Sequence, residues 1–311
     1  MPTRTFQAVA QRDPKTGRVL LDKDGKPLIA KYVIDPTKKY LRPYWINSKP
    51  QIVVLSPIGT PGDEAEIEFN VDQQGHFDWN SIVGTGTDPF TLEMVDVASY
   101  HRLQNKPVHF ANIVGSGARP FYLPEPYFLN VGLSQRTITL RVRNLIAFPN
   151  TIQISLYGRR FYHNEAPAAI SVAFMKRFGQ SERAYSYFLV PEETHNNGDI
   201  DPIPTAGTAT FRFTADSEAD AVIQKTMVAT DPPGGNFGFT IRERTTNRLI
   251  MTDEVRGFSG WGTAEFPFRL ADTYLLERQK DLLLTVTNES GVDTKFFFTM
   301  AGLRIHYDPF V

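Results

Sequence analysis

A stretch near the middle of the chain is repeated, in altered form, toward the C-terminal part. Residues 120–123 (PFYL) match residues 267–270 (PFRL) at an offset of 147, and after a three-residue deletion the offset becomes 144. At that second offset Asn144 matches Asn288. The matched positions keep an alternation of apolar and polar residues with fixed glycines and prolines, which is the pattern of strands and turns. The repeat therefore predicts two copies of one β-framework in tandem.

The composition fits two copies of a β-rich unit. At 311 residues the chain is long enough for two domains that each bury a core. Its 23 phenylalanines, 12 tyrosines, 22 glycines and 22 prolines suit many short strands joined by tight turns. The lack of cysteine excludes disulfides and thiolate metal sites. No apolar run approaches the roughly 20 residues of a membrane-spanning helix, and no signal peptide is evident, so we expect no membrane partner.

Strand-like segments separated by Gly, Pro, Asn and Asp recur in both copies, and helical crossovers are missing. We therefore expect an all-β chain of two tandem antiparallel β-sandwich or jelly-roll-like domains. In the first copy, residues 40–163, the predicted strands are 52–55, 66–71, 90–95, 107–113, 137–143 and 151–157. In the second copy, residues 183–311, they are 185–190, 208–214, 237–242, 249–253, 281–287 and 295–300.

Residues 164–182 are expected to link the two copies. Within them, residues 168–178 carry apolar side chains four positions apart, which is typical of a helix. Val172 and Ala173 also suit an extended segment. A short helix and an extended linker are therefore both open at this position.

Residues 1–39 form a basic N-terminal arm. Residues 1–50 contain eleven Lys or Arg and four Asp or Glu, so they carry +7 while the rest of the chain carries −8. Residues 18–21 and 27–34 flank a turn at Asp24-Gly25, which predicts a hairpin. Such an arm can dock on a neighbouring copy, with a solvated terminus as the alternative; its dispersed cations argue against nucleic acid. The predicted contact residues here are Arg18, Lys38, Lys39 and Arg42.

Two further groups of predicted contact residues come from comparing the copies. In the second copy the outward positions of two strands are apolar where the first copy has polar residues, so another domain, the arm or a second subunit should cover that face. In the first copy the loop 145–148 (LIAF) is apolar where the second has ESGV. This loop suits an assembly contact, or it folds back on its own core. The residues concerned are Leu145, Ile146, Phe148, Leu283 and Phe297.

No complete catalytic constellation is visible. His76-Phe77-Asp78 has the His-x-Asp spacing of non-haem iron oxygenases, but a second His, with His109 or His163 as candidates, would have to join it. The six histidines form no His-x-His or His-x-x-x-His pair, which argues against zinc. Nucleophile-elbow, Walker A and dinucleotide motifs are missing. We therefore predict no catalytic, cofactor-binding or metal site, and a chain that is not an enzyme.

The repeated block also carries a recognisable outline. In the first copy Gly117-Ala118-Arg119-Pro120-Phe121 precedes two alternating strands that end in Gly158-Arg159-Arg160, and the second copy ends its last strand in Gly302-Leu303-Arg304. This order resembles β-rich accessory proteins of tailed-bacteriophage virions. The second copy departs from it in lacking the Pro-Glu-Pro of residues 124–126. The resemblance implies a virion component of the capsid surface, neck, collar or tail, with no catalytic residues.

The favoured function is therefore structural. The chain would act through contacts with copies of itself and with other virion proteins, in a particle assembled in the host cytoplasm. A closely related alternative is a double-barrel major capsid protein, in which the two copies stand side by side. An alternative of another class is a carbohydrate- or receptor-binding β-sandwich module, in which Trp79 and Trp261 stack on sugar rings unless they belong to the core.

Overall fold

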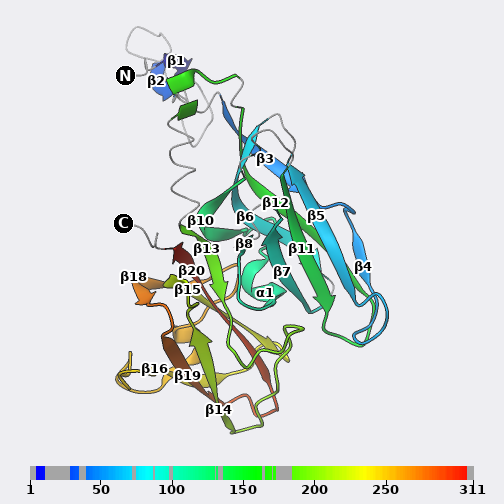
Figure 1. Ribbon diagram of the computed structural model, residues 1–311, viewed down its shortest axis with the longest axis vertical. Coiled ribbons are helices and arrows are strands. Elements are labelled where there is room, and N and C mark those ends of the chain that lie inside the picture. The colour runs from blue at the N-terminus through cyan, green and yellow to red at the C-terminus, as the bar shows by residue number, and fades with distance from the viewer. Residues whose placement is uncertain are drawn as a thin grey trace.

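The computed structural model describes residues 5–10, 29–34, 40–71, 75–86, 88–97, 101–129, 131, 136–162, 165–169, 171–172 and 184–306. Within these ranges the chain is nearly all β, with four antiparallel sheets that form two sandwiches (Figure 1). The predicted all-β, antiparallel sandwich class is confirmed. Among the described residues, no helix has the length and apolar character needed to cross a bilayer.

The first sandwich packs two sheets face to face. One has the strand order β10-β6-β12-β3, with β4 also paired to β12, and the other has the order β5-β11-β7-β8, with β9 paired to β7. A four-residue helix, α1 (Phe110–Ile113), follows β9. The strands of the first sheet are β3 (Leu41–Asn47), β4 (Val53–Leu55), β6 (His76–Gly86), β10 (Phe121–Leu129) and β12 (Asn150–Phe161). Those of the second are β5 (Glu64–Val71), β7 (Phe90–Asp96), β8 (His101–Arg102), β9 (Val108–His109) and β11 (Arg136–Asn144).

The second sandwich is built in the same way. Its sheets have the orders β13-β20-β15-β18 and β14-β19-β16-β17. The strands of the first of these sheets are β13 (Ala184–Leu189), β15 (Ala219–Asp231), β18 (Phe268–Leu276) and β20 (Lys295–His306). Those of the second are β14 (Thr208–Thr214), β16 (Phe237–Glu243), β17 (Val255–Arg256) and β19 (Asp281–Asn288).

The repeat in the sequence is a repeat of strand order in space. The order β10-β6-β12-β3 of the first sandwich corresponds to β18-β15-β20-β13 of the second, and β5-β11-β7-β8 corresponds to β14-β19-β16-β17. In both copies alternate residues of the central strands point into the core: Ile154 of β12 and Leu284 of β19 are fully buried. Burial of each such side chain contributes about 1.5–3 kcal/mol to folding.

Equivalent bulges interrupt β6 and β15. The register of the β6–β12 pair shifts beside Gly158, and the β15–β20 pair shifts beside Gly302. A Cβ atom on Gly158 would clash with the carbonyl oxygen of Asp78, and one on Gly302 with that of Val222. Glycine recurs at these repeat positions because the bulged strand presses on the backbone of its neighbour.

Several strand predictions need correction. Residues 107–113 form the short β9 and then α1, and residues 249–253 form a turn region with a bridge between Arg242 and Leu249. The seven-residue β3 and the four longer strands β6, β10, β15 and β18 were not predicted. Bulges in β6 and β15 break the alternation, and Pro124 and Pro126 obscure β10.

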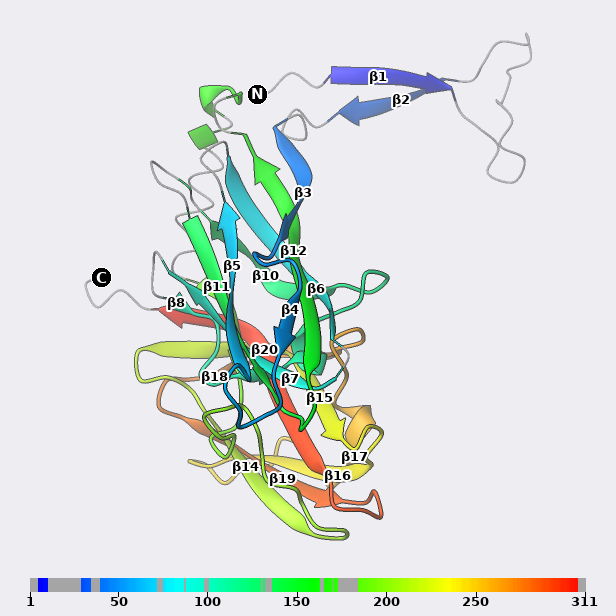
Figure 2. The same cartoon turned by 90° about the vertical axis from the view of Figure 1, so that its right-hand side faces the viewer.

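The N-terminal arm contains two described strands, β1 (Thr5–Ala10) and β2 (Ile29–Ile34), which pair antiparallel in a two-stranded sheet. The predicted strand 27–34 overlaps β2, but the partner is β1; residues 18–21 and Asp24-Gly25 lie outside the described residues. Figure 2 shows this ribbon apart from both sandwiches. In the linker, residues 168–169 and 171–172 are helical, and residues 173–183 lie outside the described part.

Candidate functional site

The two sandwiches meet through buried polar and aromatic contacts. Asn112 of α1 donates from Nδ2 to the carbonyl oxygen of Phe297 at 2.7 Å and to Oγ1 of Thr299 at 2.9 Å. The His109 ring stacks on Phe297 with centroids 4.3 Å apart. The first sandwich therefore covers the outward side chain of Phe297, which the sequence placed on an apolar outer face.

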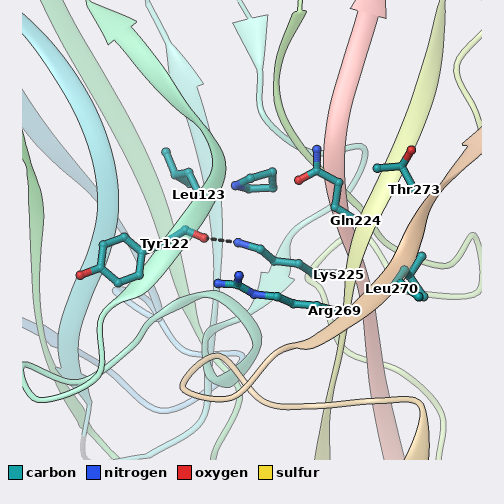
Figure 3. Close-up of a pocket in the computed structure, with 9 residues that line it drawn as sticks. Tyr122, Leu123, Gln224, Lys225, Arg269, Leu270 and Thr273 are labelled. Atoms are coloured by element: carbon teal, nitrogen blue, oxygen red, sulfur yellow. Dashed lines mark hydrogen bonds between the residues drawn. The ribbon is translucent and has the colours of Figure 1, made fainter.

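A pocket of about 330 Å³ lies beside this interface, between β10 of the first sandwich and β15 and β18 of the second. Tyr122, Leu123 and Pro124 form one wall. Lys225 and Arg269 extend from the opposite wall toward β10, with their charged ends side by side (Figure 3). Because its two walls come from different sandwiches, the pocket exists only while both units are in contact.

The ammonium group of Lys225 contacts one polar and one aromatic group of the first sandwich. Its Nζ donates to the carbonyl oxygen of Tyr122 at 2.8 Å and lies 5.4 Å from the centroid of the Phe121 ring. Burial, and then the positive charge of Arg269, lower the pKa of Lys225 to about 8, while Glu125 opposes that change. The side chain thus remains mostly protonated at neutral pH.

The two cations belong to the second copy only. Lys225 on β15 is paired across the sheet with Arg269 on β18. The equivalent pair in the first sandwich is Ser81 on β6 and Tyr122 on β10. The first sandwich has the same strand arrangement with uncharged residues at these positions. The fold therefore does not require the two cations, which instead line the pocket.

The same cross-strand row of the first sandwich carries exposed aromatic residues. Trp45, 49% exposed, is paired with Tyr157, and their ring centroids lie 4.4 Å apart. Tyr157 pairs in turn with Ser81, and Ser81 with Tyr122, which is 52% exposed. Ser81 is fully buried between the two tyrosines, and its Oγ finds no hydrogen-bond partner among the described residues. This aromatic row, Trp45–Tyr157–Tyr122, presents rings that can stack on a ligand, with the planes of Trp45 and Tyr157 inclined by 38° to each other.

Of the two roles considered for Trp79 and Trp261, the structure shows the core role. Trp79 and Trp261 are 0% and 1% exposed, so they are core residues and cannot stack on a sugar. Trp45 is the exposed one. Its neighbours Tyr44 and Ile46 are also apolar, which hid the alternation that places the Trp45 side chain outward on β3.

The His-x-Asp motif has structural partners. His76 accepts the backbone N–H of Val131 through Nδ1 at 3.2 Å, and Asp78 accepts the Nε–H of Arg159 at 2.9 Å. His109 is buried, and its pKa is lowered to about 3 by burial. Within the described ranges, no group of three or more His, Asp or Glu side chains is placed to hold a metal ion.

The predicted contact residues have different surroundings. Phe148 is 71% exposed at its loop tip, whereas Leu145 packs against the core and Ile146 is half-buried. Leu283 is half-buried on the outer face of β19. Arg42 lies 3.5 Å from Glu165 and over the Tyr162 ring of its own chain. Arg18, Lys38 and Lys39 lie outside the described residues.

No protein-family model matches the sequence. The comparison with curated proteins also returns no match. Among solved structures, PNGase F, a glycosylasparaginase from Flavobacterium meningosepticum, is similar with a TM-score of 0.38 and 9% identity, over 85% of this chain and 96% of that one. The VP2 subviral particle of infectious bursal disease virus is similar with a TM-score of 0.23 and 10% identity, over 88% of this chain and 74% of that one.

These comparisons correct one prediction. The prediction that the chain is not an enzyme is wrong as it was made, because the solved structures similar to most of the chain include a glycosylasparaginase. Two sandwiches with little shared chemistry between them do not exclude catalysis. At these TM-scores and identities the likeness assigns neither an activity nor a site residue to this chain.

Proposed function

We propose that the chain is a structural subunit of a bacteriophage virion, joined to neighbouring copies through its N-terminal ribbon, β1–β2. The observation that carries this proposal is the position of the ribbon. It is a separate two-stranded sheet, not part of any of the four sandwich sheets, and it lies apart from them (Figure 2). A two-stranded ribbon alone is marginally stable in water, so it gains most by docking on another surface.

Charge supports docking between copies. Residues 1–39 carry nine Lys or Arg and four Asp or Glu, a balance of +5, and the remainder carries −6, so the basic arm of one copy is attracted to the acidic body of the next. Such attraction acts over about 8 Å at physiological ionic strength and speeds encounter more than it strengthens a finished contact. The contact itself therefore needs an apolar or strand-pairing surface.

The outer edge of the first sandwich offers that surface. β3 and β4 occupy the edge next to β12, with the side chain of Trp45 exposed on β3, that of Val54 exposed on β4 and that of Ile52 exposed just before β4. Exposed edge strands are normally covered or blunted. The occupant we propose is the ribbon of a second copy, added to this edge by strand pairing.

Removal of residues 1–39 tests the proposal. Tyr40, whose carbonyl oxygen accepts the N–H of Tyr162, is kept so that the body stays intact. The molar mass of the full chain, measured by light scattering after size-exclusion chromatography, should rise with protein concentration because the chain associates. The shortened chain should keep its circular dichroism and thermal transition but stay monomeric and be lost from particles. Equal association and incorporation of both chains would refute the role of the ribbon.

The docking edge is tested by Val54→Lys. A charge on this exposed strand should weaken association at least tenfold, because a lysine disfavours strand addition and its burial is costly. Val292→Lys is the matched control, since Val292 is an exposed valine at a loop of the second sandwich. Equal association of both variants would remove the edge from the proposal.

Quantitative mass spectrometry of purified virions tests the location in a particle. A high copy number would support a shell subunit, including a double-barrel arrangement of the two sandwiches, and a low one would support a neck, collar or tail part. Finding no peptides of the chain in virions would refute the virion role while leaving the association result standing.

A second candidate is glycan or receptor binding, favoured by the aromatic row Trp45–Tyr157–Tyr122. Neighbouring strands lie about 4.8 Å apart, so the row spans a length that suits a short oligosaccharide. On a glycan array, Trp45→Ala should lose the signal, because stacking on the indole ring disappears. Phe148→Ala, which removes an exposed aromatic elsewhere, should keep it. An array with no signal for the native chain would refute this candidate.

A further inference from the structure

The pocket between the sandwiches contains two cationic side chains with no carboxylate lining it. Within the described residues neither Lys225 nor Arg269 forms an ion pair. The pair occupies directly opposed positions on β15 and β18, where like charges repel. An arrangement of this kind is unfavourable when the pocket holds only water and becomes favourable when an anion lies between the charges.

The donors are available for a ligand. An ammonium group has three N–H donors, and Lys225 uses one of them on the carbonyl oxygen of Tyr122. The guanidinium of Arg269 has no hydrogen-bond partner among the described residues, and its five donors form a planar fork that matches an oxyanion. Gln224 and Thr273 line the same pocket and supply neutral donors.

Comparison of the two copies indicates that the cations are not needed for the sandwich fold. Ser81 and Tyr122 fill the equivalent places in the first sandwich, so the fold is satisfied without charge there. In the second copy the charged pair stands where its sheet meets β10 of the first. The cations therefore occur at the place in the repeat where β10 supplies a second wall and an open pocket forms beside them.

We propose that this pocket binds an oxyanion, a carboxylate, sulfate or phosphate group of a small ligand, between the ammonium of Lys225 and the guanidinium of Arg269. Leu123 and Pro124 provide an apolar wall for the part of the ligand that carries the anion. The proposal is independent of the virion role, because it concerns only contacts inside one chain.

The test is calorimetric titration of the full chain with inorganic phosphate, sulfate and glucuronate at constant ionic strength, with chloride as the reference. At least one oxyanion should bind, and which of the three binds identifies the group. Lys225→Met and Arg269→Gln should each weaken that binding at least tenfold, because each removes a charge-assisted hydrogen bond. Lys280→Met is the matched control, since Lys280 lines a separate hollow together with Glu243, Glu277 and Asp281, and it should leave binding unchanged.

Two outcomes would overturn the proposal. One is a native chain that binds none of the three oxyanions more strongly than chloride. The other is unchanged binding in Arg269→Gln, whose exposed side chain can be replaced without disturbing the core. A thermal transition measured for every variant without ligand shows that each one is folded, so that lost binding is assigned to the pocket and not to unfolding.

Discussion

Asn144 and Asn288, which the repeat places at equivalent positions, make the same hydrogen bonds in the two sandwiches. Each side-chain amide donates to the carbonyl oxygen four residues downstream, at 2.7 Å in the first copy and 2.8 Å in the second. Each also donates to a carbonyl oxygen of an upstream loop, at 2.8 Å in both. Both residues are buried. The asparagine is therefore kept in the repeat because it ties two loops to the end of a core strand.

Replacing either asparagine by alanine should lower the free energy of unfolding by about 1–3 kcal/mol, because a buried amide and its hydrogen bonds to two loop carbonyl groups are lost. Urea denaturation followed by fluorescence measures the change. Gln153→Ala, which removes an exposed side chain of β12, should stay within about 0.5 kcal/mol of the native chain. Equal unfolding midpoints for Asn288→Ala and the native chain would contradict this account.

The glycines beside the two bulges should also be intolerant of a side chain. Gly158→Ala and Gly302→Ala each bring a methyl group against a neighbouring backbone carbonyl, so each should cost about 2–4 kcal/mol. Gly117→Ala is the control, since a methyl group there meets nothing within 4 Å. Thermal unfolding by calorimetry distinguishes them. Equal stability of Gly302→Ala and Gly117→Ala would contradict the close approach of the two backbones at the bulge.

His109 should make the chain sensitive to acid. Burial lowers its pKa from 6.5 to about 3 in the folded chain, so between these values the unfolded chain binds the proton more readily. The contribution of the neutral His109 ring to the free energy of unfolding is fully present above pH 6.5. As the pH falls toward 3, the free energy of unfolding decreases by a few kcal/mol.

His109→Phe should flatten that part of the profile, since phenylalanine keeps a ring against Phe297 and cannot be protonated. Denaturation midpoints between pH 3 and pH 7 give the slope. His195→Phe, at an exposed loop position, should leave the slope as it is. A profile in which both variants follow the native chain would show that the His109 ring does not govern acid stability.

The oxyanion affinity of the pocket should depend on pH. Lys225, whose pKa is about 8, is charged below that pH and neutral above it, while Arg269 remains charged and Glu125 is the nearby group of opposite sign. Binding should therefore weaken as the pH rises from 7 to 9. Titrations across that range with sulfate or glucuronate, whose charges stay constant there, measure the effect, and Lys225→Met should show a weak affinity that no longer changes. A native affinity that strengthens toward pH 9 would contradict the role given to Lys225.

The sequence predicted those strands whose two faces differ. β14 has the bounds predicted for it, and β19 exceeds its prediction by one residue, because both alternate between core and surface over their whole length. β6 and β15 lack this regularity. Much of each strand is buried on both faces, and each strand contains a bulge. Their sequences therefore lack a regular alternation of apolar and polar residues.

The pocket could not be found from the sequence for the same reason. Lys225 lies beside the bulge of β15, a strand that was not predicted, and its partner Arg269 is brought to it only by the pairing of β15 with β18. One signal was nevertheless visible. Where residues 120–123 read PFYL, residues 267–270 read PFRL, so a guanidinium takes the place of an aromatic ring in an otherwise matched segment.

The placement of β20 has a consequence for biosynthesis. This strand lies between β13 and β15, so neither has a complete set of neighbours until residues up to His306 have left the ribosome. The first sandwich, in contrast, has all its strands once Phe161 has emerged. During translation the first unit can thus fold early and present β10 and the His109 ring as a template, and the nascent second half then closes against a surface already formed.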